Sequence, residues 1–178
     1  IALPGASGAG TAVSLGNVAL GVRVRESVLV SGTGIADGAA ESGIVLTSQL
    51  VIEDNLLVCR EVGVRFATRS IHYADGSLAR NLLLAARRRG IVMLGGSLPG
   101  ASFRIDANTL FIAGDGIVGG TDGLRITDNQ IRSTRPEIGS GIVLEPGLDP
   151  AGIGHLWITG NHIAAMPGAG IDVRTPLG

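Results

Sequence analysis

The segment Ile52-Glu53-Asp54-Asn55-Leu56-Leu57 defines a frame, apolar-x-x-Asn-x-apolar, that returns along the chain. Five of the six asparagines occupy its central position, namely Asn55, Asn81, Asn108, Asn129 and Asn161. A first copy, residues 24–29, has Ser27 at the centre. The central residues are 28, 26, 27, 21 and 32 positions apart, and periods of this size are typical of solenoid repeats. We therefore expect one structural unit per copy.

A glycine followed by apolar residues comes after each central residue and sets the phase of the repeat. These pairs are Gly43-Ile44, Gly63-Val64, Gly90-Ile91, Gly116-Ile117, Gly141-Ile142 and Gly170-Ile171. The gap is eight or nine residues in four copies, and we assign loop insertions to the gaps of twelve after Asn129 and sixteen after Ser27. Units this short leave no room for crossover helices, so their two or three strands must stack in parallel, about 4.8 Å apart. The predicted fold class is all-β, a parallel solenoid of about six coils.

The Asn-x-Ile and Gly-Ile repeat over residues 20–175 resembles the single-stranded right-handed parallel β-helix of the pectate-lyase-like superfamily. Sharp bends between strands favour left-handed or bridge geometry, which asparagine tolerates well, so we expect each asparagine at the bend. Its amide can also donate to the equivalent asparagine of the next coil, giving a ladder. We interpret this column as structural rather than ligand-binding, with the apolar residues three before and two after each asparagine buried.

The domain prediction is a single β-helix domain over residues 1–178, with 1–20 as a glycine-rich lead or incomplete coil and 21–175 as stacked coils. The chain begins with Ile1 and stops soon after Val173, where another coil would begin. Because solenoid ends need caps, we interpret it as a fragment truncated at one or both ends, or a mature chain capped from elsewhere. Gly5–Thr11 resembles a phosphate-binding loop, but Thr11 stands where lysine is required.

Composition excludes several partner classes. The net charge of −1 predicts no nucleic-acid partner, and no apolar run is long enough for a membrane span. Cys59, the single cysteine, excludes an internal disulfide and is predicted to lie in the core. His72, His155 and His162 lack metal-ligand spacing, so we predict no metal and no cofactor. The resemblance favours an extracellular or cell-surface location.

The stretch from Ser77 to Arg89 has high helix propensity. Asn81 and Gly90 nevertheless keep the repeat register, so we predict strands here. The run Arg87-Arg88-Arg89 is predicted to be a solvated turn, with a helical cap or a polyanion contact as the alternative.

Enzymes of this superfamily place acids and basic residues on one outer strand face. The repeat register predicts one outward column of Arg23, Val51, Ser77, Arg104, Arg125 and Trp157. A second runs through Arg25, Glu53, Ala79, Asp106, Thr127 and Thr159. Arg104, Arg125 and Trp157 are therefore a candidate ligand-binding patch, because an aromatic face beside guanidinium groups suits sugar rings and uronate carboxylates. The alternative is a surface ion-pair ladder beside a covered Trp157.

A third outward column is predicted to run through Val45, Arg65, Val92, Val118, Val143 and Asp172. Its four valines form an apolar stripe, which a loop, a flanking domain or a second copy in a homo-oligomer would cover. Near its end, Glu145, Asp172 and Arg174 can cluster on neighbouring coils. Together with Asp106, these two acids are weak catalytic candidates, since paired carboxylates are the minimum for glycoside hydrolysis. His72, Tyr73 and Asp75, in a predicted loop after Phe66, form a second candidate ligand site.

Two functions remain. The Gly-His-Gly and Arg-Ile-Lys patterns of polygalacturonase-like enzymes are missing, the chain contains no lysine, and no aspartate cluster of the calcium-binding pectate-lyase type occurs. These observations favour a non-catalytic β-helix scaffold or interaction module of a larger protein that contacts a polysaccharide. The alternative is a fragment or divergent member of a polysaccharide lyase or glycoside hydrolase group.

Overall fold

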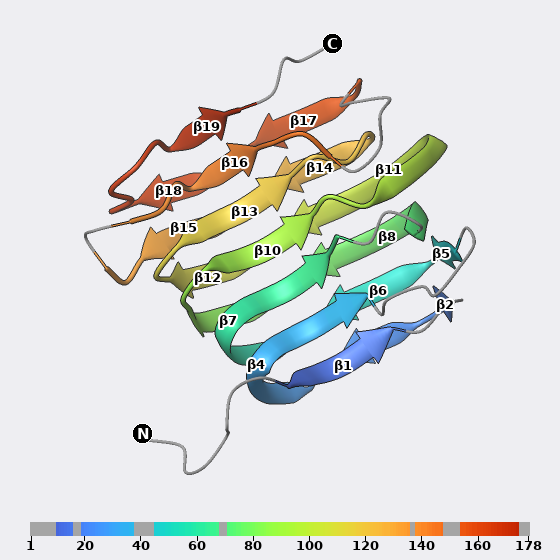
Figure 1. Ribbon diagram of the computed structural model, residues 1–178, viewed down its shortest axis with the longest axis horizontal. Coiled ribbons are helices and arrows are strands. Elements are labelled where there is room, and N and C mark those ends of the chain that lie inside the picture. The colour runs from blue at the N-terminus through green and yellow to red at the C-terminus, as the bar shows by residue number, and fades with distance from the viewer. Residues whose placement is uncertain are drawn as a thin grey trace.

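The computed structural model describes residues 10–15, 19–37, 45–67, 71–135, 138–147 and 154–174 (Figure 1). These residues form β-strands joined by turns, with no helix among them. The strands belong to two curled sheets, which we call sheet A and sheet B. The paired strands run parallel, each beside its equivalent in the neighbouring coil, as expected for a β-solenoid. No segment of the described residues is a helix with the length and hydropathy needed to cross a membrane.

Sheet B contains the strands that precede the central residue of each repeat. They are β2 (Ala19–Leu20), β3 (Arg23–Arg25), β5 (Val45–Ser48), β6 (Leu50–Glu53), β8 (Ile71–Ala79), β11 (Gly96–Asp106), β14 (Leu124–Thr127) and β17 (Leu156–Thr159). Strand β8 pairs with both β5 and β6, which are separated at Gln49, a residue with a φ of 56°.

Sheet A contains the strands that follow the central residue, and it curls round two sides of the molecule. In the first coils the path is one long strand, β4 (Val28–Asp37) or β7 (Leu56–Phe66). Later coils divide it into β9 (Leu82–Ala86) and β10 (Arg89–Met93), β12 (Thr109–Ile112) and β13 (Asp115–Gly119), β15 (Gln130–Ser133) and β16 (Ile142–Leu144), and β18 (His162–Ala164) and β19 (Ile171–Val173). The first half of β7 therefore pairs with β9 and its second half with β10. Strand β1 (Thr11–Leu15) pairs with the second half of β4.

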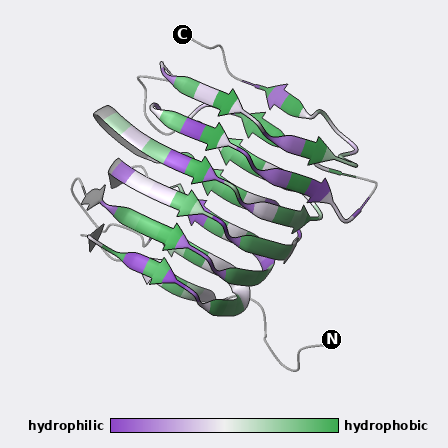
Figure 2. Ribbon diagram, turned by 180° about the vertical axis from the view of Figure 1, so that it is seen from behind, coloured by the Kyte–Doolittle hydropathy of each residue, from purple (hydrophilic) through white to green (hydrophobic). Residues whose placement is uncertain are grey.

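The core lies inside the stack. Along each strand, every second side chain points into it. The apolar residues three before and two after the central asparagines are fully buried in the middle coils, as predicted; examples are Ile105 and Leu110 around Asn108. The corresponding residues of the last coil, Ile158 and Ile163, are only partly buried. Figure 2 shows the alternation of hydrophobic and hydrophilic residues along the strands.

The asparagine ladder is confirmed. Each asparagine amide donates to the side-chain oxygen of the asparagine in the next coil, at 2.9 Å from Asn55 to Asn81 and 3.0 Å from Asn81 to Asn108. The same oxygen accepts the backbone N–H of the preceding asparagine. The ladder continues through Asn129 to Asn161. From Asn81 to Asn161, each ladder oxygen thus accepts two hydrogen bonds from the preceding asparagine, which explains why the position favours an amide.

The left-handed bend lies one residue earlier than predicted. The residue immediately before each central residue has a positive φ, for example Asp54 (58°), Arg80 (54°), Ala107 (51°) and Asp128 (54°). The asparagines themselves do not take this conformation. The expectation that asparagine marks the bend because it tolerates left-handed geometry was therefore wrong. Its amide hydrogen bonds account for the repeat, and the strained backbone is left to varied, exposed residues.

The glycine marker has a steric cause, and its first member was misassigned. Strand pairing aligns Ile35 with Val64, so the glycine of the first coil is Gly34 and not Gly43. The gap of sixteen residues after Ser27 was an error, because Gly34 comes seven residues after it. A Cβ at Gly63 or Gly90 would lie 2.6 Å from the carbonyl oxygen of the next glycine in the column. The column therefore requires glycine for close backbone approach.

Two local predictions are corrected by strand assignments. His72, Tyr73 and Asp75 lie in strand β8 and not in a loop, because β8 extends from Ile71 and pairs with β5. Residues 77–89 form strands as predicted, but only Arg87 and Arg88 belong to the turn. Arg89 begins β10, paired with Val62 and Asp115 on either side.

The predicted exposed valine stripe is also corrected. Val92, Val118 and Val143 do pair in one row, but Val45 belongs to sheet B, where it pairs with Ile71. The three valines are at most 3% exposed and form a small cluster with Leu94. Because the chain itself already buries these side chains, they offer no surface to a flanking domain or a second copy.

Candidate functional site

The outer face of sheet B presents the first two predicted columns in the predicted register. Strand pairing aligns Arg104 with Ser77 on one side and with Arg125 on the other, and Arg125 with Trp157. The neighbouring column aligns Asp106 with Thr127. Outward residues of successive coils lie one strand spacing apart, about 4.8 Å. A ligand lying along the solenoid axis would therefore meet one of these side chains in every coil.

Trp157 stands at the C-terminal end of this face and is 44% exposed. The guanidinium carbon of Arg125 lies 4.7 Å from the centre of the indole ring, within cation–π range. The ring of His155 lies on another side of the indole, with centroids 6.2 Å apart and planes 19° from parallel. The indole is therefore held in place by two neighbours while nearly half of its surface stays in contact with solvent.

Asp122 anchors the segment that carries His155. Its carboxylate accepts the backbone N–H groups of Gly154, at 3.0 Å, and of His155, at 2.5 Å, and lies 3.4 Å from Nδ1 of His155. Burial alone would raise the pKa of Asp122, but the hydrogen bonds from His155, Gly123 and Gly154 outweigh it and lower the pKa. Asp122 thus stays ionised and holds the segment against the preceding coil.

Asp122 and His155 were not predicted as site residues. His155 could have been found, because it precedes Trp157 by two positions and strand residues two apart share a face. Asp122 gave no such signal, since the turn that follows β13 sets its position.

Two adjoining hollows follow the face. One, of about 350 Å³, is lined by Ala101, Ser102, Asp122, Gly123, Arg125, His155 and Trp157. The other, of about 430 Å³, includes Asp75, Ser77, Ser102, Arg104 and Asp106 among its walls. Ser102 borders both. Their walls bring the predicted Arg104, Arg125 and Trp157 to one side of the molecule, with Asp75 from the second candidate set, and we call the two hollows together the depression.

Charges in this depression are unequally paired. Glu53 contacts Arg25 at 2.9 Å and Arg80 at 3.1 Å, and Asp54 contacts Arg80 at 2.8 Å. The hydrogen bond from Arg80 is the largest cause that lowers the pKa of Asp54. By contrast, Arg104 and Arg125 have no carboxylate within ion-pair distance among the described residues. Two exposed guanidinium groups therefore remain open to an anionic ligand.

The three weak catalytic candidates are not brought together. Asp106 lies on sheet B and accepts a hydrogen bond of 2.6 Å from Thr127 Oγ1. Glu145 follows β16 and Asp172 lies in β19, both on the sheet A side. Glu145 receives two hydrogen bonds from Arg89, at 2.8 and 3.2 Å. The predicted cluster of Glu145, Asp172 and Arg174 exists as an ion-pair network.

Arg174 is the centre of that network. It lies 2.7 Å from Asp172 and 3.7 Å from Glu145. The hydrogen bond that Arg174 donates to Asp172 is the main cause that raises the pKa of Arg174. Both carboxylates therefore contact arginine side chains and belong to one ion-pair network.

The side chains of His72 and Tyr73 lie outside the part of the structure that is described, although their strand positions are known. Asp75 accepts the backbone N–H of Ser102 at 3.4 Å, a long contact. Within the described residues, no group of three or more His, Cys, Asp or Glu side chains could hold a metal ion.

Comparison with family models, curated proteins and solved structures gives no match. The function of the site has to be inferred from its own geometry.

Proposed function

We propose that this chain is a right-handed parallel β-helix of the pectate-lyase-like type that serves as a non-catalytic binding module, with the outer face of sheet B as a platform for an acidic polysaccharide. Parallel strands in curled sheets and the internal asparagine ladder support the fold assignment. The observation that carries the function is the partly exposed Trp157 beside Arg125, continued by Arg104 along the same column.

The chemistry of this face suits a chain of uronate units. The exposed part of the indole offers an apolar surface to a sugar ring. Arg125 and Arg104 offer planar forks that bind carboxylates in bidentate fashion. Because these side chains repeat from coil to coil, a polysaccharide laid along the depression would meet an aromatic contact at one end and cations further along.

The positions and partners of the candidate acids favour binding over hydrolysis. Retaining and inverting glycosidases both need two carboxyl groups facing one glycosidic bond. Here Glu145 and Asp172 are held by arginines on the sheet A side, and Asp106 stands on sheet B. The lyase or hydrolase alternative would therefore need a base or acid other than these three.

The test is titration calorimetry with an oligogalacturonate and with a neutral oligosaccharide of equal length. We expect Trp157→Ala to weaken oligogalacturonate binding at least ten-fold, because the one aromatic contact of the proposed platform is lost. Arg125→Lys should weaken oligogalacturonate binding about five-fold or more and leave any binding of the neutral sugar unchanged, because lysine lacks the bidentate fork. Arg132→Lys, on sheet A, is the matched control and should change neither.

Two results would contradict the proposal. Equal binding of acidic and neutral sugars, or binding that survives Trp157→Ala in a folded chain, would remove the platform. Release of reducing ends or unsaturated products from the oligogalacturonate would instead support the enzymatic alternative.

A further inference from the structure

The outer face of the first half of sheet A is apolar and exposed, in contrast to the charged outer face of sheet B. Its outward residues form two columns, set by strand pairing. One column runs Val28, Leu56, Leu82, Thr109, Gln130 and His162, and the other runs Val30, Val58, Leu84, Phe111, Arg132 and Ala164. The first three coils are aliphatic throughout, and Phe111 extends the apolar surface into the fourth.

This apolar surface is in contact with solvent. Val28 is 67% exposed, Val30 43%, Leu82 36% and Phe111 37%. Sheet B offers the comparison within the same molecule, since its outward columns carry Arg23, Arg25, Glu53, Arg104 and Asp106. The solvated face of a sheet normally carries polar residues. A contiguous exposed apolar patch marks an interaction site. The contrast between the two sheets therefore points to a partner for sheet A.

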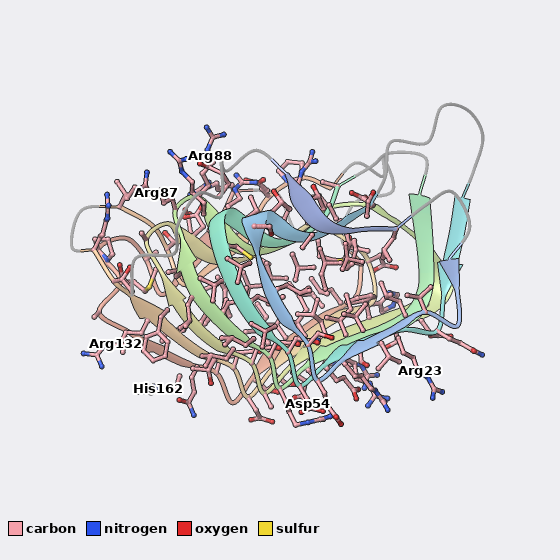
Figure 3. All side chains as sticks on the ribbon, turned by 90° about the horizontal axis from the view of Figure 1, so that it is seen from below. Arg23, Asp54, Arg87, Arg88, Arg132 and His162 are labelled. Atoms are coloured by element: carbon pink, nitrogen blue, oxygen red, sulfur yellow. The ribbon has the colours of Figure 1, made fainter. Side chains whose placement is uncertain are left out.

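The two edges of this face carry opposite charge. The turn at the start of its strands presents Glu26, Asp54 and Asp128, with Arg80 as the cation among them. The turns and strand ends at the other edge present exposed arginines, with Glu61 as the acid among them; these are Arg60, Arg87, Arg88 and Arg135. Figure 3 shows Asp54 at one end of the face and Arg87 and Arg88 at the other.

We propose that a second copy of this chain covers the face, related by a two-fold axis that lies in the interface and runs along the solenoid. Such an axis reverses the strand direction and keeps the coil order, so the acidic edge of one copy meets the basic edge of the other. A two-fold axis along the strands would instead place acid on acid and arginine on arginine. Charge complementarity thus selects both the partner and its orientation.

The dimensions suffice for such a contact. Six stacked strands about 4.8 Å apart span about 29 Å, and five residues at about 3.3 Å each span about 17 Å. The footprint is therefore about 500 Å² per copy and about 1,000 Å² in total, at the lower limit of specific interfaces. We expect a reversible dimer whose population rises over the micromolar concentration range and falls with added salt, because the edge charges are solvent-exposed.

The test is sedimentation velocity of the whole chain over a concentration series. Leu82→Arg and Val28→Arg should each raise the dimer dissociation constant at least ten-fold. Val51→Arg places the same charge on the outer face of sheet B and should leave it unchanged. Val28 is the more exposed of the two target positions, so its substitution should disturb the fold least. Melting curves of the three variants separate loss of the dimer from loss of the fold. A chain that stays monomeric at every concentration, or a dimer insensitive to both substitutions, would overturn the proposal.

Orientation is tested by cross-linking. The proposed axis places Leu82 of one copy opposite Leu84 of the other, across sheets that pack about 10 Å apart. A mixture of Leu82→Cys and Leu84→Cys chains should therefore cross-link through a bis-maleimide of that reach several-fold more than either variant alone. The native Cys59 is only 2% exposed and does not compete. Equal cross-linking in the mixture and in the single variants would refute the arrangement.

Discussion

Substitution of Asn108 by alanine removes the middle of the asparagine ladder. Asn108 is fully buried, and its side chain makes four hydrogen bonds. It accepts from the backbone N–H and from the amide of Asn81, each at 3.0 Å. It donates to the carbonyl oxygen of Leu78, at 2.7 Å, and to Asn129, at 3.0 Å.

The cost follows from the groups left behind. Two donors of Asn81 lose their acceptor in a region that water does not reach. A buried donor without a partner costs about 1–3 kcal/mol, so Asn108→Ala should lower the free energy of unfolding by about 2–6 kcal/mol. For a chain of this length, each 1 kcal/mol lowers the melting temperature by roughly 2–4 °C. A decrease of at least about 4 °C is therefore expected.

Asn161→Ala is the matched control. Asn161 also accepts the backbone N–H and the amide of Asn129, but it is only partly buried, at the last rung. Water can replace its hydrogen bonds, so we expect a loss of about 1 kcal/mol or less. Thermal and urea unfolding followed by circular dichroism measure both variants. Equal losses for the two, or an unchanged melting temperature for Asn108→Ala, would refute the role assigned to the ladder.

Three further outcomes are expected. Gly90→Ala should lose about 1–3 kcal/mol of stability through overpacking, because its Cβ would lie 2.6 Å from the oxygen of Gly116. Gly170→Ala, where the Cβ meets nothing within 4 Å, should be tolerated, and urea unfolding compares the two. Burial raises the pKa of the Cys59 thiol from 9.0 to about 11. The contribution of this thiol to the free energy of unfolding should therefore be constant below pH 9 and decline as the pH approaches 11. Unfolding of the wild type and of Cys59→Ala over a pH series measures this contribution. The pKa of Asp122 lies below its ordinary value of 3.8. The stability that its contacts contribute should therefore be fully present above pH 3.8 and be lost as the pH falls through the lowered pKa. The fluorescence of the sole tryptophan should report this change, and Asp122→Asn should abolish it.

Much of the architecture was predictable from local pattern. The asparagine frame has a period of 21–32 residues. Asparagines at that period can hydrogen-bond to one another only if successive coils stack. The outward columns of sheet B followed from the same register, since strand residues alternate between two faces. The repeat register alone therefore places Arg104, Arg125 and Trp157 on one face.

The wrong predictions concern features that local pattern does not decide. Gly34-Ile35 and Gly43-Ile44 both fit the glycine marker, and only pairing with β7 distinguishes them. The valine row was predicted to be exposed because it alternates with the core residues, yet Val118 and Val143 are fully buried. Alternation specifies which way a side chain points and contains no information about what other part of the chain covers it.

The sequence by itself determined the stacking of parallel strands, the buried asparagine column and the side chains that share an outer face, because each depends on a short repeated spacing. The tertiary structure decided which exposed charges are already neutralised, where Asp122 and His155 stand relative to Trp157, and which outer face remains apolar. Those properties depend on turns of variable length and on contacts between different coils, such as Asp122 with Gly154 and Arg89 with Glu145, which no local spacing encodes.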